Sequence, residues 1–504
     1  MPKLQPFALA DVQPTRKTRP HDFLLFFALF AIPLIAVHLP LLSLPFFWDE
    51  AGQFIPTALD LFRHGDWVAR STIPNVHPPG VEAYLAIWYK LVGFSIPATR
   101  VAMLLLASAG LLITFLLAIE LSKGTQGAPA FLPPLLLFVS PLFYTQSMMA
   151  QLDMPATVFS LLALLFFLQK RYALSAAASL LLVLSKETGL VVPIVLAGFL
   201  LSQREWRRAA YFTAPAVALG VWLLVLHHAT GYWLGDPGFA HYNIAYSLHP
   251  VRLLTSLVRR IYYLFFAEFR WIGTVLLLFT LRSAEPFRSQ AWRITVIVFG
   301  AQFLLVTVLG GAELERYLLP VLPIFYIAVA VALTFIERSA LRISAIAALV
   351  LGLAVNLFWN PPYPFPYENN WAMVDFVRLQ QSAAGFSERN FPGSAIATAW
   401  PFSEELRRSD LGYVSQRWNA IETNDFHYAS IAAIPPQRFN VLITYTRTWA
   451  PAGGVLAIPF VRDFLSRYYD WQPEITAEQC AALGLHETVS WQSRGQSITV
   501  YRRR

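Results

Sequence analysis

Long apolar segments alternate with short polar connections along the first 359 residues of the chain. A helix needs about 20 apolar residues to cross the ~30 Å hydrocarbon core of a bilayer, so most of these segments are candidate crossings. The pattern predicts a polytopic, all-α membrane domain over residues 22–359 with about eleven transmembrane helices. The segments cover residues 22–46, 98–119, 129–147, 155–169, 172–185, 187–202, 209–228, 258–281, 293–311, 317–336 and 342–359.

Two of these segments are short for a membrane crossing. Residues 172–184 would form a helix of only ~20 Å at ~1.5 Å per residue, well below the thickness of the hydrocarbon core. The segment at 155–169 is nearly as short, and Asp153 precedes it. We expect the turn at Ser185-Lys186-Glu187 to lie below the outer surface, in a recessed, water-filled cavity.

The first outer loop, residues 48–97, is long but has a regular pattern. Apolar residues recur at helical spacing over residues 50–67 and again over residues 81–92. We therefore expect two amphipathic helices lying at the membrane interface, with Trp67, Trp88 and Tyr89 at the level of the lipid headgroups. Packing of these helices on a soluble domain is the alternative.

The character of the chain changes after Trp359. Residues 360–366 are rich in proline and stiffen the exit from the membrane domain. Residues 360–504 are predicted to form a soluble α/β domain. Its expected strands are residues 394–399, 439–445 and 497–501, its helices are 371–381 and 461–469, and a hairpin over 489–502 turns near Arg494-Gly495.

Composition supports a membrane protein. Hydrophobic residues make up 56% of the 504 positions and charged residues only 13%, against about a quarter charged in soluble proteins. The net charge of +8 does not indicate nucleic-acid binding, because Lys and Arg lie mostly in short connections on one side. The positive-inside rule places that side, and the tail of residues 1–21, in the cytoplasm. We expect a multi-pass plasma (inner) membrane protein with an extracytoplasmic or periplasmic C-terminal domain. The single cysteine, Cys480, excludes an intrachain disulfide.

Acidic residues gather in the connections on the outer side. Charge within a membrane protein is costly, so such a cluster marks a candidate site. Asp49 and Glu50 directly follow the first predicted membrane helix, and Asp153 precedes another. For each of these positions, capping of a helix is the alternative to a chemical role.

Cations lie near the same predicted face. Lys186 suits an anionic lipid headgroup, and an internal ion pair with Glu187 is the alternative. Arg316, followed by Tyr317, begins a membrane helix, where it is either an interface anchor or a bidentate ligand of phosphate. Arg100, in the first turn of the second membrane helix, is a third cation.

Acids and cations together at a membrane surface indicate group transfer from a lipid-linked phosphate. One base must deprotonate the acceptor hydroxyl, and cations must stabilise the departing phosphate. Because a phosphate leaving group is a weak base, a dedicated general acid is not required. This asymmetry fits the sequence better than the paired carboxylates of a glycosidase.

At these positions the chain resembles the GT-C glycosyltransferases. The closest resemblance is to the branch that holds dolichyl-phosphate-mannose protein mannosyltransferases and bacterial aminoarabinose lipid A transferases (families 39 and 83), and it covers residues 22–340. It rests on Trp48-Asp49-Glu50, on His77-Pro78-Pro79 followed by an amphipathic helix and Gly93 to Arg100, on Leu152-Asp153-Met154, on Ser185-Lys186-Glu187, and on Arg316-Tyr317-Leu318-Leu319-Pro320.

The resemblance implies transfer of a hexosyl or pentosyl group from a polyprenyl-phosphate donor at the outer face, with inversion at the anomeric carbon. It implies that Asp49 is the catalytic base, Glu50 its supporting partner and Asp153 a second acid. It implies donor-phosphate ligands at Lys186 and Arg316, to which Arg100 and Tyr317 are added as candidates.

The remaining candidates are acceptor or loop residues, and two of them are also candidate metal ligands. Because some members of the resembling family use a divalent cation, His77, Asp153 and His241 could contribute ligands, although no spacing in the sequence decides this. His77, Glu187 and His241 are candidate acceptor or loop residues, and an ordinary loop histidine is the alternative for His241. The hydroxyl acceptor, whether protein, lipid or glycan, stays open.

Two other functions compete. A transporter of a lipid-linked or small polar substrate also places charges within the membrane, but it predicts internal repeats, and none is found in the sequence. A non-catalytic binding or assembly protein would use the C-terminal domain to recruit partners and would tolerate loss of Asp49.

Overall fold

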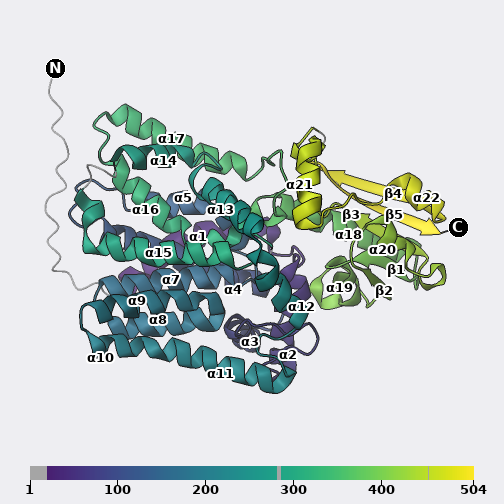
Figure 1. Cartoon of the computed structure of the whole chain (residues 1–504), viewed down its shortest axis with the longest axis horizontal. Coiled ribbons are helices and arrows are strands. Elements are labelled where there is room, and N and C mark those ends of the chain that lie inside the picture. Colours follow the sequence, from purple (N-terminus) through teal and green to yellow (C-terminus); the bar gives the residue numbers. More distant parts are fainter. Residues whose placement is uncertain (1–19, 281–284, 311, 452, 504) are drawn as a thin grey trace.

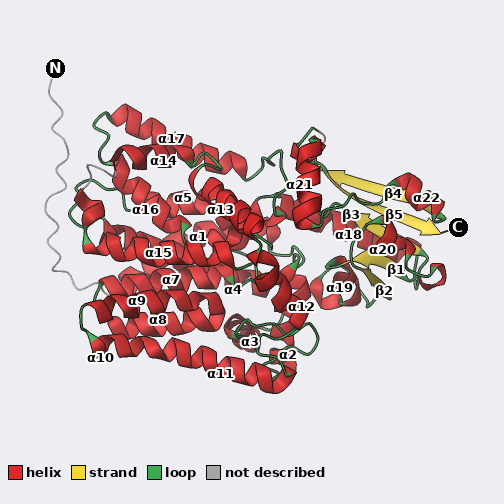
Figure 2. Ribbon diagram, in the orientation of Figure 1, coloured by secondary structure: helices red, strands yellow, loops and turns green. Residues whose placement is uncertain are grey.

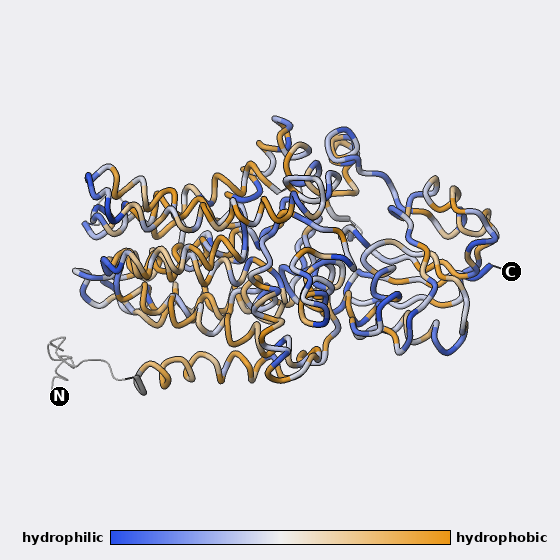
Figure 3. Tube along the Cα trace, turned by 90° about the horizontal axis from the view of Figure 1, so that it is seen from below, coloured by the Kyte–Doolittle hydropathy of each residue, from blue (hydrophilic) through white to orange (hydrophobic). Residues whose placement is uncertain are grey.

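A computed structural model describes residues 20–280, 285–310, 312–451 and 453–503. Of the predicted cytoplasmic tail, residues 1–19 lie outside the described residues. Helices form one elongated layered body, and a smaller domain with a β-sheet lies at one end of it (Figure 1). The strands occur only in that smaller domain (Figure 2). Hydrophobic positions follow the helices of the body, and hydrophilic positions gather at their ends (Figure 3).

Five helical stretches are long and apolar enough to cross a membrane. In the most apolar window of each, 72% of residues are buried in α4 but only 17% in α17, so α4 is central and α17 peripheral. Exposed leucine and isoleucine side chains on such peripheral helices suit contact with lipid. The stretches are α1 (Pro20–His38) with the 3₁₀ turn Leu39–Leu41, α4 (Ile96–Leu121), α10 (Trp206–Ala209) with α11 (Thr213–Thr230), α15 (Gln290–Val308) and α17 (Ser339–Asn356).

Shorter apolar helices fill the centre of the body. Helix α16 is apolar all round and almost wholly buried, as expected for a helix surrounded by others. The predicted short segments at 155–169 and 172–185 are confirmed as the short helices α7 and α8, which pack against each other. These elements are α5 (Leu132–Val139), α6 (Pro141–Gln146), α7 (Asp153–Leu168), α8 (Tyr172–Ser185), α9 (Val191–Ser202), α14 (Trp271–Thr280) and α16 (Leu322–Leu333).

Two predicted segments are wrong as single helices. Residues 129–147 divide into α5 and α6 at Ser140, whose ψ of 124° is extended, because Pro141 disfavours the helical conformation in the residue before it. Residues 258–281 divide into the amphipathic α13 (Pro250–Phe265) and α14. Between these two helices, Glu268 and Phe269 have positive φ, and the buried Arg270 donates hydrogen bonds to the carbonyl of Tyr263.

Residues 48–97, the predicted first outer loop, contain the two helices expected there. They are α2 (Ile55–His64), preceded by a π-helical turn (Glu50–Phe54), and α3 (Gly80–Val92). The predicted placement of Tyr89 at headgroup level is wrong. Its side chain is only 1% exposed, and its hydroxyl lies 2.9 Å from the hydroxyl of Thr99. The exposed residues of α3 are mostly apolar instead: Ile87, Leu91 and Val92 are uncovered, together with Lys90.

The smaller domain contains a five-stranded sheet of order β2-β1-β3-β5-β4. Strands β1–β3 are parallel, whereas β5 pairs antiparallel with β3 and β4, which confirms the hairpin turning at Arg494-Gly495. The strands are β1 (Ile396–Ala399), β2 (Ala420–Thr423), β3 (Val441–Tyr445), β4 (Leu485–Ser493) and β5 (Gln496–Arg503). The helices are α18 (Ala372–Asn390), α19 (Phe402–Arg407), α20 (Tyr428–Ala432), α21 (Pro459–Tyr469) and α22 (Ala477–Ala482).

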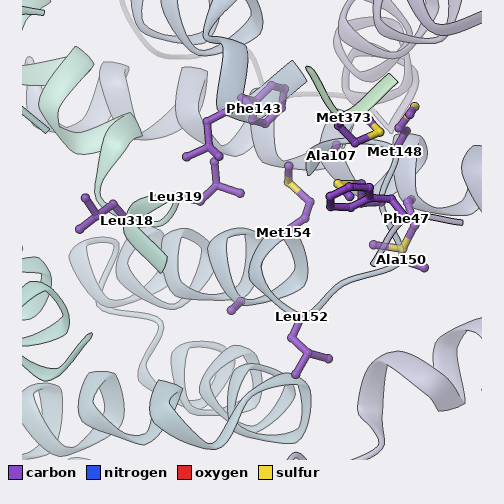
Figure 4. Close-up of a cluster of buried hydrophobic side chains, with 14 of the residues drawn as sticks. Phe47, Ala107, Phe143, Met148, Ala150, Leu152, Met154, Leu318, Leu319 and Met373 are labelled. Atoms are coloured by element: carbon purple, nitrogen blue, oxygen red, sulfur yellow. The ribbon is translucent and has the colours of Figure 1, made fainter. Parts of the chain in front are cut away.

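The two parts share one apolar core. Phe47 and Met148 of the helical body and Met373 of α18 belong to the same cluster of buried side chains (Figure 4). Leu152 and Met154, which flank Asp153, belong to this cluster as well. The predicted acidic site residues are therefore attached to a packed core, which they share with the sheet domain.

The first outer loop touches the sheet domain at Gly52. A Cβ atom at this position would lie 2.5 Å from the ring of Trp400, which also packs edge-on against Trp48 with ring centroids 5.7 Å apart. We expect Gly52→Ala to lower the free energy of unfolding by about 1–3 kcal/mol through overpacking. Gly198→Ala in α9, where nothing lies within 4 Å, is the control and should not destabilise. Thermal unfolding in detergent measures the stability of both variants. Equal transition temperatures would contradict the close contact between Gly52 and Trp400.

Candidate active site

A cavity of about 630 Å³ lies at the junction of the helical body and the sheet domain. Its wall combines the turn after α1, the loop at 48–97, the start of α7, the turn after α8, the loops after α11 and after α15, and the segment after α17. Seven of the predicted site residues line it, namely Asp49, His77, Asp153, Lys186, Glu187, Arg316 and Tyr317. The structure thus brings together residues that are spread over nearly 270 positions of the sequence.

Asp49 is presented by a strained turn. Trp48 has a φ of 47°, in the left-handed region that bulky residues rarely adopt. Packing of the Trp48 ring against Phe376 and Trp400 accompanies this conformation. Strain of this kind persists only where the surroundings hold it, and it is common at functional sites.

Arg316 is the electrostatic centre of the cavity. Its guanidinium forms an ion pair with Asp49, and lies 3.1 Å from carboxylate oxygens of both Asp153 and Glu368. It also donates a 2.9 Å hydrogen bond to Gln151. Three carboxylates around one nearly buried cation hold it in a fixed orientation.

Lys186 is recessed, as expected from the short helix α8. Its side chain is 12% exposed, and Nζ donates a 2.6 Å hydrogen bond to Asp153 and lies 4.3 Å from the centre of the Tyr317 ring. The alternative of an internal Lys186–Glu187 pair does not form. Glu187 instead lies 2.6 Å from Nδ1 of His77, which joins the first outer loop to the turn after α8.

Glu50 and Arg100 do not line the cavity. Both side chains are 0% exposed and are joined by a 2.5 Å ion pair. Glu50 also accepts hydrogen bonds from the backbone N–H groups of Phe47 and Ala150. This placement differs from the predicted phosphate contact of Arg100, because its guanidinium is used on Glu50 and on the carbonyls of Leu44, Pro45 and Met148.

His241 does not line the cavity and lies in the loop, in agreement with the alternative of an ordinary loop histidine. It begins the π-helical turn His241–Ala245 with an exposed side chain, while the following residues, Tyr242 to Ile244, line the cavity. Within the part of the chain that the structure describes, no group of three or more His, Cys, Asp or Glu side chains could hold a metal ion. His77, Asp153 and His241 therefore do not converge on a shared cation site.

Several cavity residues are not predicted from the sequence. Glu368, Trp400 and Arg447 come from the segment after residue 360, which carries no catalytic motif, and Tyr242 is one of many loop aromatic residues. Glu368 is 3% exposed, and burial raises the pKa of its carboxyl to about 7, an effect that Arg316 opposes. Its only sequence signal is its position directly after the proline-rich exit.

Comparisons with known proteins give matches of structure alone. Neither a protein-family model nor a curated protein sequence matches this chain. ArnT from Cupriavidus metallidurans, solved bound to undecaprenyl phosphate, superimposes with a TM-score of 0.55 at 14% identity, over 96% of this chain and 98% of that one. The apo state of the same protein superimposes with a TM-score of 0.52 at 15% identity, over 93% of this chain and 97% of that one.

A second match comes from an archaeon. The Archaeoglobus fulgidus oligosaccharyltransferase AglB, solved with an inhibitory peptide and a dolichol-phosphate, gives a TM-score of 0.51 at 11% identity, over 94% of this chain and 73% of that one. ArnT and AglB are both GT-C glycosyltransferases. Similarity over nearly the whole chain, at this low identity, establishes the architecture. The chain is thus a membrane protein with the GT-C fold.

Proposed function

We propose that this protein is a membrane glycosyltransferase that moves a sugar from a polyprenyl-phosphate donor to a hydroxyl acceptor. The observation that carries the proposal is the cavity in which Lys186 and Arg316 lie beside Asp49 and Asp153. The undecaprenyl phosphate bound to ArnT and the dolichol-phosphate bound to AglB support a donor of this chemical class.

The proposed reaction is an inverting displacement at the anomeric carbon. Asp49 takes the proton of the acceptor hydroxyl while that oxygen forms a bond to the anomeric carbon. The bond from this carbon to the phosphate oxygen breaks, and its electron pair stays on the phosphate. Asp49 suits the role because Oδ2 is held by Arg316, whereas no described residue donates a hydrogen bond to Oδ1.

Lys186 and Arg316 supply the positive charge for the departing phosphate. Apart from Asp153, no described residue accepts a hydrogen bond from Nζ of Lys186, so its other donors are free for phosphate oxygens. Arg316 adds charge at the same place, and Tyr317 holds Lys186 through its ring. Glu50 and Arg100 act as positioning residues, because their ion pair fixes the backbone on both sides of Asp49.

We also propose how the protein is placed in the membrane. Residues 22–359 form the membrane domain with about eleven crossings, α2 and α3 lie at the interface, and residues 360–504 form the outer domain. The positive-inside rule supports a cytoplasmic N-terminus in an inner membrane and a cavity that opens outward. The exposed apolar face of α3 supports its interfacial position.

Lys186→Met tests the phosphate site. Loss of a charge-assisted hydrogen bond of ~1.5–3 kcal/mol should raise KM for a polyprenyl-phosphate sugar by about 10–150-fold. Lys123→Met is the matched control, because Lys123 is exposed and, among the described residues, pairs with Glu120 alone. Initial rates over a range of donor concentrations in liposomes give the donor KM of each variant. An unchanged donor KM in Lys186→Met, with the variant folded, would remove Lys186 from the donor site.

A further inference from the structure

Arg447 is the cavity-lining cation that the proposed reaction leaves unused. Among the other cavity-lining charges, Lys186 and Arg316 are paired with carboxylates, and Glu187 is paired with His77. Arg447 also lines the cavity; the carboxylates of Glu474 and Asp425 act on it electrostatically, but no described carboxylate lies within ion-pair distance of its guanidinium. A half-buried guanidinium in a cavity wall that forms no direct ion pair with a described residue is an available anion ligand.

The backbone around Arg447 is fixed on both sides. Thr446 continues the β3–β5 pairing by exchanging hydrogen bonds with Ser497, and its carbonyl accepts a 3.1 Å hydrogen bond from Tyr367. Trp449 is buried and donates a 2.7 Å hydrogen bond to the carbonyl of Pro361. Arg447 therefore projects from a rigid position in the sheet domain, which lowers the entropic cost of binding a ligand.

One side of the guanidinium is already oriented. Nη1 donates a 3.0 Å hydrogen bond to the carbonyl of Asn424, and the backbone N–H of Arg447 donates to Glu474. No described residue accepts a hydrogen bond from Nε or Nη2. These two nitrogens form the edge that binds a carboxylate or a phosphate in bidentate fashion.

The position of Arg447 within the cavity indicates that the anion it binds is part of the acceptor. Lys186 and Arg316, the proposed phosphate ligands, are nearly buried in the helical body, whereas Arg447 is half-buried and belongs to the sheet domain. The cavity wall also includes Trp400 of that domain and Tyr242 of the outer loop. Aromatic rings beside a guanidinium are suited to an anionic sugar or a similar polar group entering from water.

We propose that Arg447 binds an anionic group, a carboxylate or a phosphate, on the acceptor, and so makes the enzyme selective for acidic acceptors. This inference rests on the proposed glycosyltransferase function. Arg447 is a specificity residue, since it takes no part in bond formation at the anomeric carbon.

Binding of small probes tests the inference without turnover. Glucuronate and glucose 6-phosphate should change the tryptophan fluorescence of the full-length protein in nanodiscs, and uncharged glucose should not. Arg447→Gln should weaken binding of both anions by about tenfold or more, and Arg447→Lys should recover part of it. Arg417→Gln, on an exposed arginine of the same domain, is the control. Equal binding of glucose and the anions, or unchanged anion binding in Arg447→Gln, would overturn the inference.

Transfer from a labelled polyprenyl-phosphate sugar to an envelope extract separates this inference from the function itself. We expect the labelled products to bind an anion exchanger, and Arg447→Gln to raise KM for the acceptor while KM for the donor is unchanged. Neutral products formed equally well by both proteins would overturn the acidic-acceptor inference and leave the glycosyltransferase function standing. Specific anion binding without any transfer would overturn the proposed function and leave Arg447 as an anion site.

Discussion

Asp49→Asn is expected to lower the rate of sugar transfer by about 10²–10⁴-fold, the contribution of a general base. The amide cannot accept the proton of the acceptor hydroxyl, but it keeps the shape of the side chain. Donor binding should remain nearly intact, because Lys186 and Arg316 still provide the positive phosphate site. Parallel measurements of single-turnover transfer and of donor binding by the purified variant separate these two effects.

The control for this variant is Asp66→Asn. Asp66 lies in the same outer loop and pairs with the well-exposed Arg70, a surface ion pair that contributes little to stability. Transfer by Asp66→Asn should therefore equal that of the wild type. Activity of Asp49→Asn within tenfold of the wild type would remove Asp49 from the role of base.

Glu50→Gln is expected to destabilise the fold by about 3–5 kcal/mol, because it leaves the charge of Arg100 buried without a counter-charge. The change would also loosen the turn before Asp49, since a Glu50 oxygen accepts the N–H of Phe47. The double variant Glu50→Gln with Arg100→Met removes both charges and should be clearly more stable than Glu50→Gln alone. Thermal unfolding of the wild type, both single variants and the double variant gives the coupling energy between the two side chains.

The outcome of this cycle decides the role assigned to the pair. A coupling energy near zero would show that the buried ion pair does not hold the site together. A stable Glu50→Gln variant that has also lost transfer would indicate that Glu50 acts in the chemistry rather than through the position of Asp49.

The fold and much of the site could be predicted from the sequence, because charged residues are costly within a membrane and are therefore concentrated at functional or structural positions. The shortness of the segment at 172–184 predicted a recessed Lys186, and in the structure its side chain is 12% exposed and pairs with Asp153. The recurring apolar spacing in the first outer loop likewise predicted α2 and α3. Each of these signals is local, so it can be read from neighbouring residues.

The errors concern contacts between distant segments. Tyrosine is common at membrane interfaces, but Tyr89 is buried, and its hydroxyl forms a hydrogen bond with the hydroxyl of Thr99. Arg100 and Lys186 are equivalent in sequence as cations near a helix end, and only the packing of Glu50 shows that Arg100 is structural. Glu368 and Arg447 reach the cavity through the placement of the sheet domain, and no spacing in the sequence reports that placement.

The most direct test of the account is transfer of radiolabelled sugar from a panel of polyprenyl-phosphate sugars by the purified protein in liposomes, with an envelope extract as acceptor. The account predicts that label reaches a hydroxyl acceptor and that free polyprenyl phosphate appears in equal amount. Failure of transfer from every donor, together with measurable movement of a lipid-linked substrate across the bilayer, would contradict the account and identify a transporter.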